Sequence, residues 1–365
     1  MKKLILVLMF LVSSLTYCRI ITVDNKYPSI GDFTTLRSAL RSVYNSGDTI
    51  FLLPSPQDYQ GDTVLRKTVI LGVGWDKPAL DSYLSSISGI MYFSPSSNGA
   101  FLEGLLLPCV ININADNISI KRNKITTCCA NIYLSHNNIL IENNLIESYG
   151  SSVQNNNGLN HGLLDIADSN IVTIINNLFH NLNTGGAYAG DQTYNSSKVS
   201  ILTVNGQNSS LLISNNIFIL QVAMETNGWT GAQSVRNWDW SIITSNNSQQ
   251  VRNNIFINGV MSCPSNSTSY NLGFNTTIPG GEANYNILLT DTTTLFIAGG
   301  YHLQANSPAK SKGRNGVDIG IYGGSTPFVD GGYPGIPSII DLQSDHAATK
   351  QNGIQIKLKA KSNKD

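Results

Sequence analysis

The chain repeats one short phrase at widening intervals. Each copy has apolar residues in alternating positions, then a polar pair ending in Asn, then two more apolar residues. The pairs are Arg122-Asn123, Asn143-Asn144, Asn176-Asn177, Asn215-Asn216, Asn253-Asn254 and, as a last trace, Tyr285-Asn286. Their second asparagines are 21, 33, 39, 38 and 32 residues apart. This self-similarity predicts a solenoid, in which each coil buries its apolar residues only by stacking on its neighbours.

The apolar residues of each phrase predict coils that are made of β-strands. They lie two positions apart, as in Ile118-Ser119-Ile120 and Val172-Thr173-Ile174, which is the period of a strand. Strands that recur at one place in successive coils pair in parallel along the solenoid axis, and their inward residues form a continuous core. The sequence therefore predicts an all-β fold.

The asparagines of the pairs have a structural and a ligand-binding interpretation. Asn tolerates a left-handed backbone at a tight bend, and stacked Asn side chains can bond along the axis as a ladder. We expect the structural role for Asn123, Asn144, Asn177, Asn216 and Asn254, and ligand binding is the alternative.

Both ends of the chain resemble known proteins. Phe33 to Leu40, followed by Gly47 to Leu52, is similar to the helix-then-strand entry of the right-handed parallel β-helix proteins of the pectin-lyase-like superfamily. Leu36, Ala39, Leu40 and Val43 have helical spacing and Gly47 is a stop signal. Ser307-Pro308-Ala309 and Asp318 to Gly324 resemble the ending of uncharacterised exported β-helix proteins of Bacteroidetes-type bacteria. The resemblance implies a right-handed parallel β-helix with an N-terminal capping helix.

The N-terminus indicates export. Lys2 and Lys3 precede an apolar run that is too short to span a membrane. We expect a signal peptide at 1–18, a β-helix domain at 19–324 and a C-terminal breaker-rich segment with a terminal strand at 325–365. The protein would be secreted or at the cell surface, with a lipid anchor at Cys18 as the alternative, although Tyr17 fits that poorly.

The charge balance excludes nucleic acid as the main partner. The 365 residues include 23 basic and 23 acidic side chains, and removal of Lys2 and Lys3 leaves 21 basic ones. No basic stripe occurs outside the tail. No glycine-rich phosphate loop or nucleophile elbow stands in the required context. The sequence does not indicate an oligomeric state.

Four cysteines would remain after export: Cys109, Cys128, Cys129 and Cys263. Cys109 precedes the Cys128-Cys129 pair by 19 and 20 residues, which is close to one coil. A disulfide is therefore permitted there, and buried thiols are the alternative. No histidine lies at zinc-ligand spacing from them.

The widening of the repeat is the main functional signal. Relative to a 21-residue coil, the later repeats are longer by 12, 18, 17 and 11 residues. We place the extra residues in Ser148–Gly162, Asn181–Ser197, Gln221–Asn237 and Asn258–Gly281. Insertions at equivalent points of stacked coils emerge along one edge and can wall a groove.

The insertions are rich in aromatic and hydrogen-bonding residues: Asn155, Asn156, Asn157, His161, Tyr188, Asp191, Tyr194, Glu225, Trp229, Arg236, Trp238 and Trp240. Sugar rings stack on aromatic faces while their hydroxyls need donors and acceptors. Asp165 follows the first insertion, and its apolar neighbours should point inward. The predicted substrate-binding residues are His161, Asp165, Tyr188, Asp191, Trp229, Arg236 and Trp238. The alternatives are that the tryptophans pack on the coil or contact a protein.

Catalysis stays open at this point. Elimination on a uronic polymer needs a cation at the carboxylate and a base, for which Asp165, Lys198 and Arg236 are weak candidates. Calcium would need converging carboxylates, and the sequence shows no clear site for it. The paired aspartates and Gly-His-Gly of polygalacturonases are missing. We expect recognition of an extracellular or cell-surface polysaccharide, with lyase activity as an extension; a non-catalytic adhesion scaffold for a protein partner is the alternative.

The tail is predicted to hold one more strand. Pro327, Pro334 and Pro337 lie in a breaker-rich stretch, and Ile354 to Lys361 alternates apolar and basic residues. We expect this strand to pair along the last coil and cover its edge, with its lysines preventing aggregation. Attraction to acidic glycan or envelope lipid is the alternative.

Overall fold

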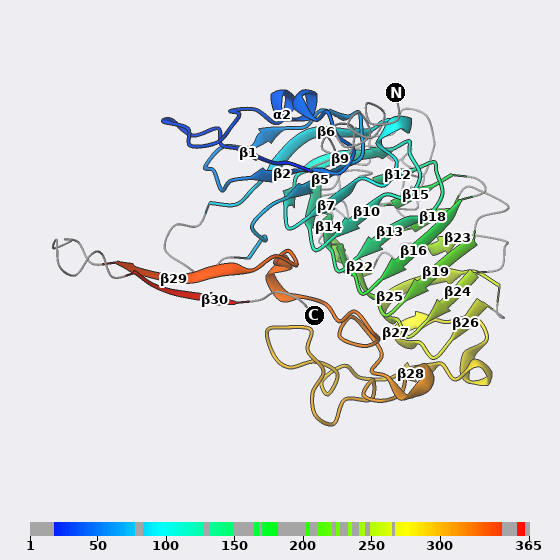
Figure 1. The fold of residues 1–365 in the computed structure, drawn as a ribbon. Helices are drawn as coiled ribbons and strands as arrows, with labels where there is room; N and C mark the ends of the chain where they lie inside the picture. Colours follow the sequence, from blue (N-terminus) through cyan, green and yellow to red (C-terminus); the bar gives the residue numbers. More distant parts are fainter. Residues whose placement is uncertain are drawn as a thin grey trace, which may run out of the picture.

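The chain folds into a parallel β-helix of three sheets, and the central coils contribute one strand to each sheet (Figure 1). The computed structural model describes residues 18–76, 83–127, 132–148, 164–167, 170–181, 202–204, 210–220, 224–226, 233–235, 241–244, 249–264, 267–344 and 356–361. Among the described residues, the strand pairs between successive coils are parallel, with one register irregularity between Ser241 and Thr244. The predicted fold class is confirmed.

The first sheet runs the length of the solenoid. Its strands, in spatial order, are β1 (Ile20–Val23), β2 (Asp48–Leu52), β5 (Thr68–Leu71), β7 (Phe101–Glu103), β10 (Ser119–Lys121), β13 (Ile139–Glu142), β16 (Ile171–Ile175), β19 (Ser210–Ser214), β24 (Gln249–Arg252) and β26 (Thr268–Ser269).

The second and third sheets are joined through the long strand β25 (Ile255–Ser262). The second comprises β8 (Leu106–Leu107), β11 (Lys124–Thr127), β14 (Leu145–Ser148), β17 (Leu178–Asn181), β20 (Ile217–Leu220), β25, β27 (Leu272–Thr277) and β28 (Ile287–Leu289). The third comprises β3 (Tyr59–Gln60), β6 (Ile87–Phe93), β9 (Cys109–Ile113), β12 (Ile132–Leu134), β15 (Leu164–Ile166), β18 (Leu202–Val204), β23 (Ser241–Thr244) and the end of β25. The short β4 (Thr63–Val64) pairs with β6.

The core is built from the inward residues of every coil. In the second sheet, Phe179, Phe218 and Phe256 occupy one position in three successive coils, with ring centroids 4.7 and 5.2 Å apart. All three are buried. Offset stacks of this kind add stabilisation beyond the burial of apolar area.

The ladder role predicted for the asparagines is confirmed. In each step the backbone N–H and Nδ2 of one Asn both donate to Oδ1 of the next, at 2.8–3.2 Å, from Asn123 through Asn144, Asn177, Asn216, Asn254 and Asn271 to Asn286. The bend assignment needs one correction. The left-handed residue is the first member of each pair, such as Asn143 (φ 58°) and Asn176 (φ 55°).

Asn271 reveals a coil that the repeat count missed. The segment Asn258–Gly281, predicted as a fourth insertion, instead contains β26, the Tyr270-Asn271 pair and β27. Tyr270 takes the left-handed position with φ 56°. A tyrosine in place of the usual Asn obscured the pair. The interval of 32 residues therefore holds two short coils rather than one extended coil.

The predicted capping helix is present. Helix α2 (Leu36–Ser42) buries Leu36, Ala39 and Leu40 against the first coil, and the Thr35 side chain caps it by accepting from the N–H of Ser38. It lies at the N-terminal end of the solenoid (Figure 1). The helix ends at Ser42, before Gly47, whose φ of 96° serves the turn that leads into β2.

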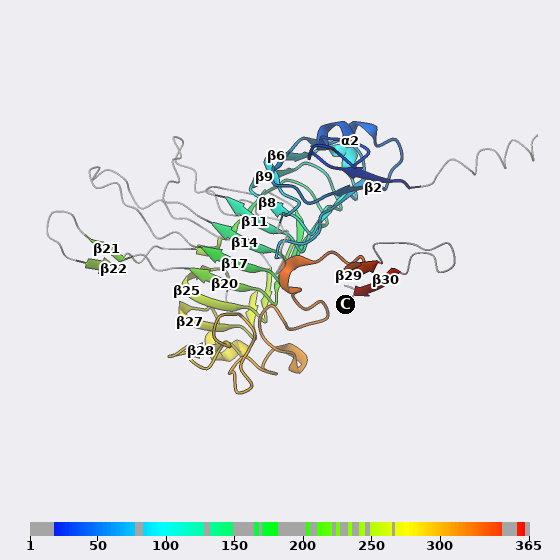
Figure 2. The ribbon, with the colours of Figure 1, turned by 90° about the vertical axis from the view of Figure 1, so that its left-hand side faces the viewer.

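Residues 295–335, called the C-terminal segment below, run back along the outside of the solenoid (Figure 2). The outward side chains of the left-handed turn residues hold it. Asn253 Oδ1 accepts from Arg314 N–H at 2.8 Å, and Asn176 Nδ2 donates to the carbonyls of Ile321 and Gly323 at 2.7 Å. This row of turn residues thus clamps the backbone of a distant segment.

The terminal strand forms where it was predicted but pairs differently. Strand β30 (Ile356–Lys361) pairs antiparallel with β29 (Ser338–Ser344), not with the last coil. The two strands form a ribbon that projects from the solenoid (Figure 1). The expectation that this strand covers the edge of the last coil is therefore wrong. No described helix is long and apolar enough to cross a membrane.

Candidate functional site

Three of the four predicted insertions leave the solenoid at one corner. They lie between β14 and β15, between β17 and β18, and between β20 and β23, where the second sheet passes to the third. The last of them contains a hairpin of β21 (Met224–Thr226) and β22 (Gln233–Val235), which projects outward (Figure 2). The prediction that these three emerge along one edge is confirmed.

Most predicted site residues cannot be placed. His161, Tyr188, Asp191, Lys198, Trp229, Arg236 and Trp238 lie outside the described residues. Asp165 is described, on β15. Its neighbours Leu164 and Ile166 are fully buried in the core, as expected from the alternation. Asp165 is itself only 7% exposed, so it lies in a covered position rather than on an open wall.

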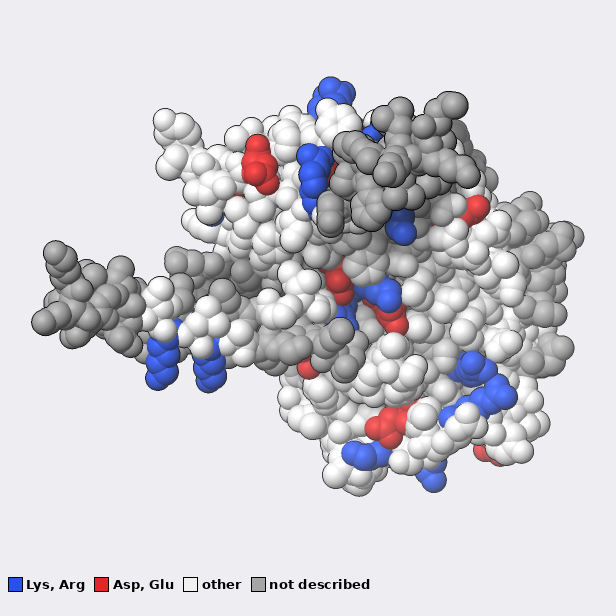
Figure 3. Space-filling model, in the orientation of Figure 1, with Lys and Arg blue, Asp and Glu red and all other residues white. Residues whose placement is uncertain are grey.

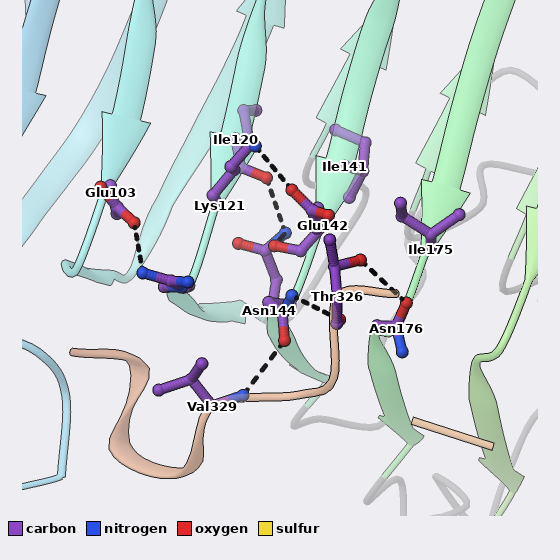
Figure 4. Close-up of polar contacts among 12 residues, drawn as sticks. Glu103, Ile120, Lys121, Ile141, Glu142, Asn144, Ile175, Asn176, Thr326 and Val329 are labelled. Carbon is purple, nitrogen blue, oxygen red and sulfur yellow. Dashed lines mark hydrogen bonds and ion pairs between the residues drawn. The ribbon is translucent and has the colours of Figure 1, made fainter. Parts of the chain in front are cut away.

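The outer face of the first sheet carries a charged row that sequence reasoning missed. Glu103, Lys121 and Glu142 are in register at the ends of three adjacent strands (Figure 4). Lys121 Nζ lies 2.6 Å from Glu142 Oε2, and Arg122 Nη1 lies 3.3 Å from Glu103 Oε1. Acidic and basic side chains alternate near the centre of this face (Figure 3). The available signal was a charged residue directly before some of the polar pairs, such as Lys121 and Glu142.

The charged row is better suited to structure than to catalysis. Glu103, Arg122 and Glu142 are 7, 8 and 5% exposed. Each carboxylate is matched by a cation, which offsets the cost of removing it from water. The C-terminal segment passes closely over this region. Gly332 packs so near the carbonyl oxygen of Arg122 that a side chain at this position would clash with it. A substrate carboxylate would have to displace these pairs.

The outer face of the second sheet is occupied by the protein itself. Leu145, Leu178 and Ile217 occupy one outward row and form a second apolar cluster with Ile319 and Ile321 of the C-terminal segment. This packing removes the face from solvent and leaves little room for a ligand.

A polar array remains at the edge of the second sheet, where the insertions begin. Lys124 Nζ lies 2.8 Å from Glu147 Oε2, and Tyr301 Oη lies 3.3 Å from His180 Nδ1. Burial lowers the pKa of His180, the charge of Glu147 raises it and that of Lys124 lowers it. Burial also raises the pKa of Tyr301. The contact between His180 and Tyr301 fastens the C-terminal segment to β17.

The outer face of the third sheet combines aromatic and hydrogen-bonding groups. Tyr92, Asn112, Tyr133 and Asp165 are in register on four successive coils, and we call them the third-sheet row. Their neighbours along each strand are core residues, so the row points outward. Tyr92, Asn112 and Tyr133 are half-buried.

A chain of polar contacts fixes one end of this face. Asn114 Nδ2 donates to Tyr92 Oη at 2.8 Å, and Asn114 Oδ1 lies 2.5 Å from His136 Nε2. The other ring nitrogen of His136 lies 3.3 Å from Asp116 Oδ1. The tyrosine and amide are thereby held in fixed orientations before a ligand arrives.

No metal centre is found in the described part of the chain, where no three His, Cys, Asp or Glu side chains gather. The chain matches no protein-family model, no curated protein and no solved structure. The site must therefore be interpreted from its own geometry.

Proposed function

We propose that the protein recognises a polysaccharide through the outer face of the third sheet. The observation that carries the proposal is the half-buried part of the third-sheet row, in which Tyr92, Asn112 and Tyr133 follow one another at adjacent strands, whereas Asp165 at the end of the row is covered. Adjacent strands are about 4.8 Å apart, so an extended polymer lying along the axis meets one of these side chains at every coil.

The chemistry of the row fits sugars. A tyrosine ring offers an apolar face for a pyranose and a hydroxyl for a hydrogen bond. Amides and carboxylates supply the donors and acceptors that sugar hydroxyls require. Asn114 and His136 hold Tyr92 in place through hydrogen bonds, which lowers the entropic cost of binding.

Two further arguments support this face over the others. The second sheet is covered by the C-terminal segment, and the charged row of the first sheet is internally neutralised. The third sheet begins at the corner from which the three insertions emerge, with their aromatic residues. The resemblance to the pectin-lyase-like superfamily and to exported β-helix proteins agrees with an extracellular polysaccharide as the ligand.

The test is a polysaccharide array with the protein lacking its proposed signal peptide, residues 19–365. We expect retention on at least one polymer and loss of that retention in Tyr92→Ala/Tyr133→Ala. Tyr44→Ala is the matched control, since Tyr44 is 73% exposed and lies on the capping end. Circular dichroism establishes that each variant keeps its β-structure.

The outcomes separate the claims. No retention on any polymer would contradict polysaccharide recognition. Retention that survives the double substitution would contradict the third-sheet site alone. The same array is read for unsaturated products with and without calcium. Product release would extend the proposed function to a polysaccharide lyase.

A further inference from the structure

The terminal ribbon separates apolar and basic side chains on one strand. In β30, Ile356 and Leu358 are 66 and 53% exposed, and Lys357 and Lys359 are exposed between them. Successive residues of a strand point to opposite faces. The apolar residues therefore lie on one face of the ribbon and these two lysines on the other. Basic side chains project together from one side of the ribbon (Figure 3).

This arrangement is unusual for a free element of a folded protein. A two-stranded ribbon is marginally stable in water unless its apolar face packs on something. In the β29–β30 pairing Ser338 lies opposite Lys361, and Leu342 lies opposite Leu358. The ribbon nevertheless projects away from the solenoid (Figures 1 and 2). The large exposed side chains on it call for a partner surface.

We propose that the ribbon docks on an anionic phospholipid surface. The apolar residues enter the boundary between headgroups and acyl chains, as the apolar face of interfacial amphipathic elements does. Lysine stems are long enough to bring their ammonium groups back to the phosphate layer. The lysines of the basic face thus pair with lipid phosphates, and the bilayer covers the apolar face.

A second copy of the chain fits the apolar face of the ribbon less well than a lipid surface does. Stable protein interfaces bury roughly 800 Å² on each partner. Two large exposed side chains on β30 supply only a small part of that area, and pairing the apolar faces would leave the lysines without a role. A lipid surface needs no matching partner shape.

The test is co-sedimentation of residues 19–365 with vesicles. This form lacks the apolar run of the proposed signal peptide, which would itself bind lipid. We expect binding to vesicles of equimolar phosphatidylglycerol and phosphatidylcholine, and none to phosphatidylcholine alone. Lys357→Gln/Lys359→Gln should weaken binding about 25-fold, from about fivefold for each lysine near an anionic surface. Ile356→Ser/Leu358→Ser should also abolish most of the binding.

The matched control is Lys310→Gln/Lys312→Gln, which removes two exposed lysines from the C-terminal segment and should leave binding unchanged. Three results would overturn the proposal: no vesicle binding, equal binding to neutral vesicles, or an equal loss in the control. Concentration-dependent dimerisation that Ile356→Ser/Leu358→Ser removes, without vesicle binding, would instead assign the apolar face to a second copy.

Discussion

Oδ1 of Asn177 accepts two hydrogen bonds from Asn144, one from its backbone N–H at 2.9 Å and one from its Nδ2 at 3.0 Å. Asn177 Nδ2 in turn donates to the carbonyls of Ile141 and Ile175 at 2.8 and 2.9 Å. One buried side chain thus satisfies polar groups in two neighbouring coils, as buried polar groups require. Coil stacking depends on the ladder as well as on the apolar core.

Replacing Asn177 by Ala should strongly destabilise the solenoid. The substitution leaves the buried N–H of Asn144 without its acceptor and removes the bonds that Asn177 Nδ2 donates to the carbonyls of Ile141 and Ile175. Each buried group left unsatisfied costs about 1–3 kcal/mol. We expect urea denaturation to show a loss of about 4 kcal/mol in the free energy of unfolding. Asn98→Ala is the control, because exposed Asn98 accepts one bond from Asn117. Similar losses in the two variants would contradict the ladder's role.

The first Asn of a pair should hold the C-terminal segment, whereas the second Asn stabilises the stacking of the coils. Asn176 has φ 55° and holds the carbonyls of Ile321 and Gly323. Asn176→Gly keeps the left-handed turn accessible but removes both bonds. We expect faster hydrogen exchange at Phe328 and its neighbours, because the C-terminal segment is released, while exchange in the core strands stays slow.

Asn138→Gly is the matched control for that experiment. Asn138 is exposed, has φ 56°, and its Nδ2 donates to Asn117 rather than to the C-terminal segment. Its replacement should leave exchange at Phe328 unchanged. If Asn138→Gly accelerated exchange at Phe328 as much as Asn176→Gly, the bonds from Asn176 would not be what holds the C-terminal segment.

The sequence could predict the coils because alternation and the recurring Asn are strong signals. It could not show which Asn of an Asn-Asn pair bends the backbone, since both are the same residue. Pairs with different residues, such as Arg122-Asn123 and Tyr270-Asn271, distinguish the two positions, because their second member is Asn while their first member varies. A ladder needs the same amide in every coil, whereas a left-handed turn accepts several residues.

The candidate site was harder to predict for a related reason. Tyr92, Asn112 and Tyr133 become neighbours only through strand register, and nothing in their local sequence marks them. The long insertions drew attention to their own aromatic residues instead. Likewise, the alternation of Ile354 to Lys361 predicted a strand but carried no information about its partner, and β29 pairs with it.

The folded state should lose stability on acidification partly through His180. Burial is the largest influence on its pKa and lowers it. An unfolded histidine titrates near 6.5, so the unfolded chain takes up a proton that the folded chain resists. This contribution to stability is present above about pH 6.5 and is lost as the pH falls from there toward the lowered folded pKa.

The measurement is urea denaturation about one pH unit above and about one below 6.5, the unfolded value. His180→Gln should reduce the fall in stability between the two conditions. Tyr301→Phe keeps the imidazole and removes only the hydroxyl near His180 Nδ1, so it should retain most of the fall. A steeper fall in His180→Gln would show that the sign of the coupling is wrong.

Cys109 is a buried free thiol in β9, which agrees with the thiol alternative, while Cys128 and Cys129 lie outside the described residues. Burial raises its pKa to about 12, so almost no reactive thiolate forms near neutral pH. We expect iodoacetamide to leave Cys109 unmodified in the native protein. In urea without reductant the same residue should be alkylated completely, as peptide mass mapping would show. Modification that required a reductant in urea would mean that Cys109 is bonded to another cysteine, and it would overturn the free-thiol assignment.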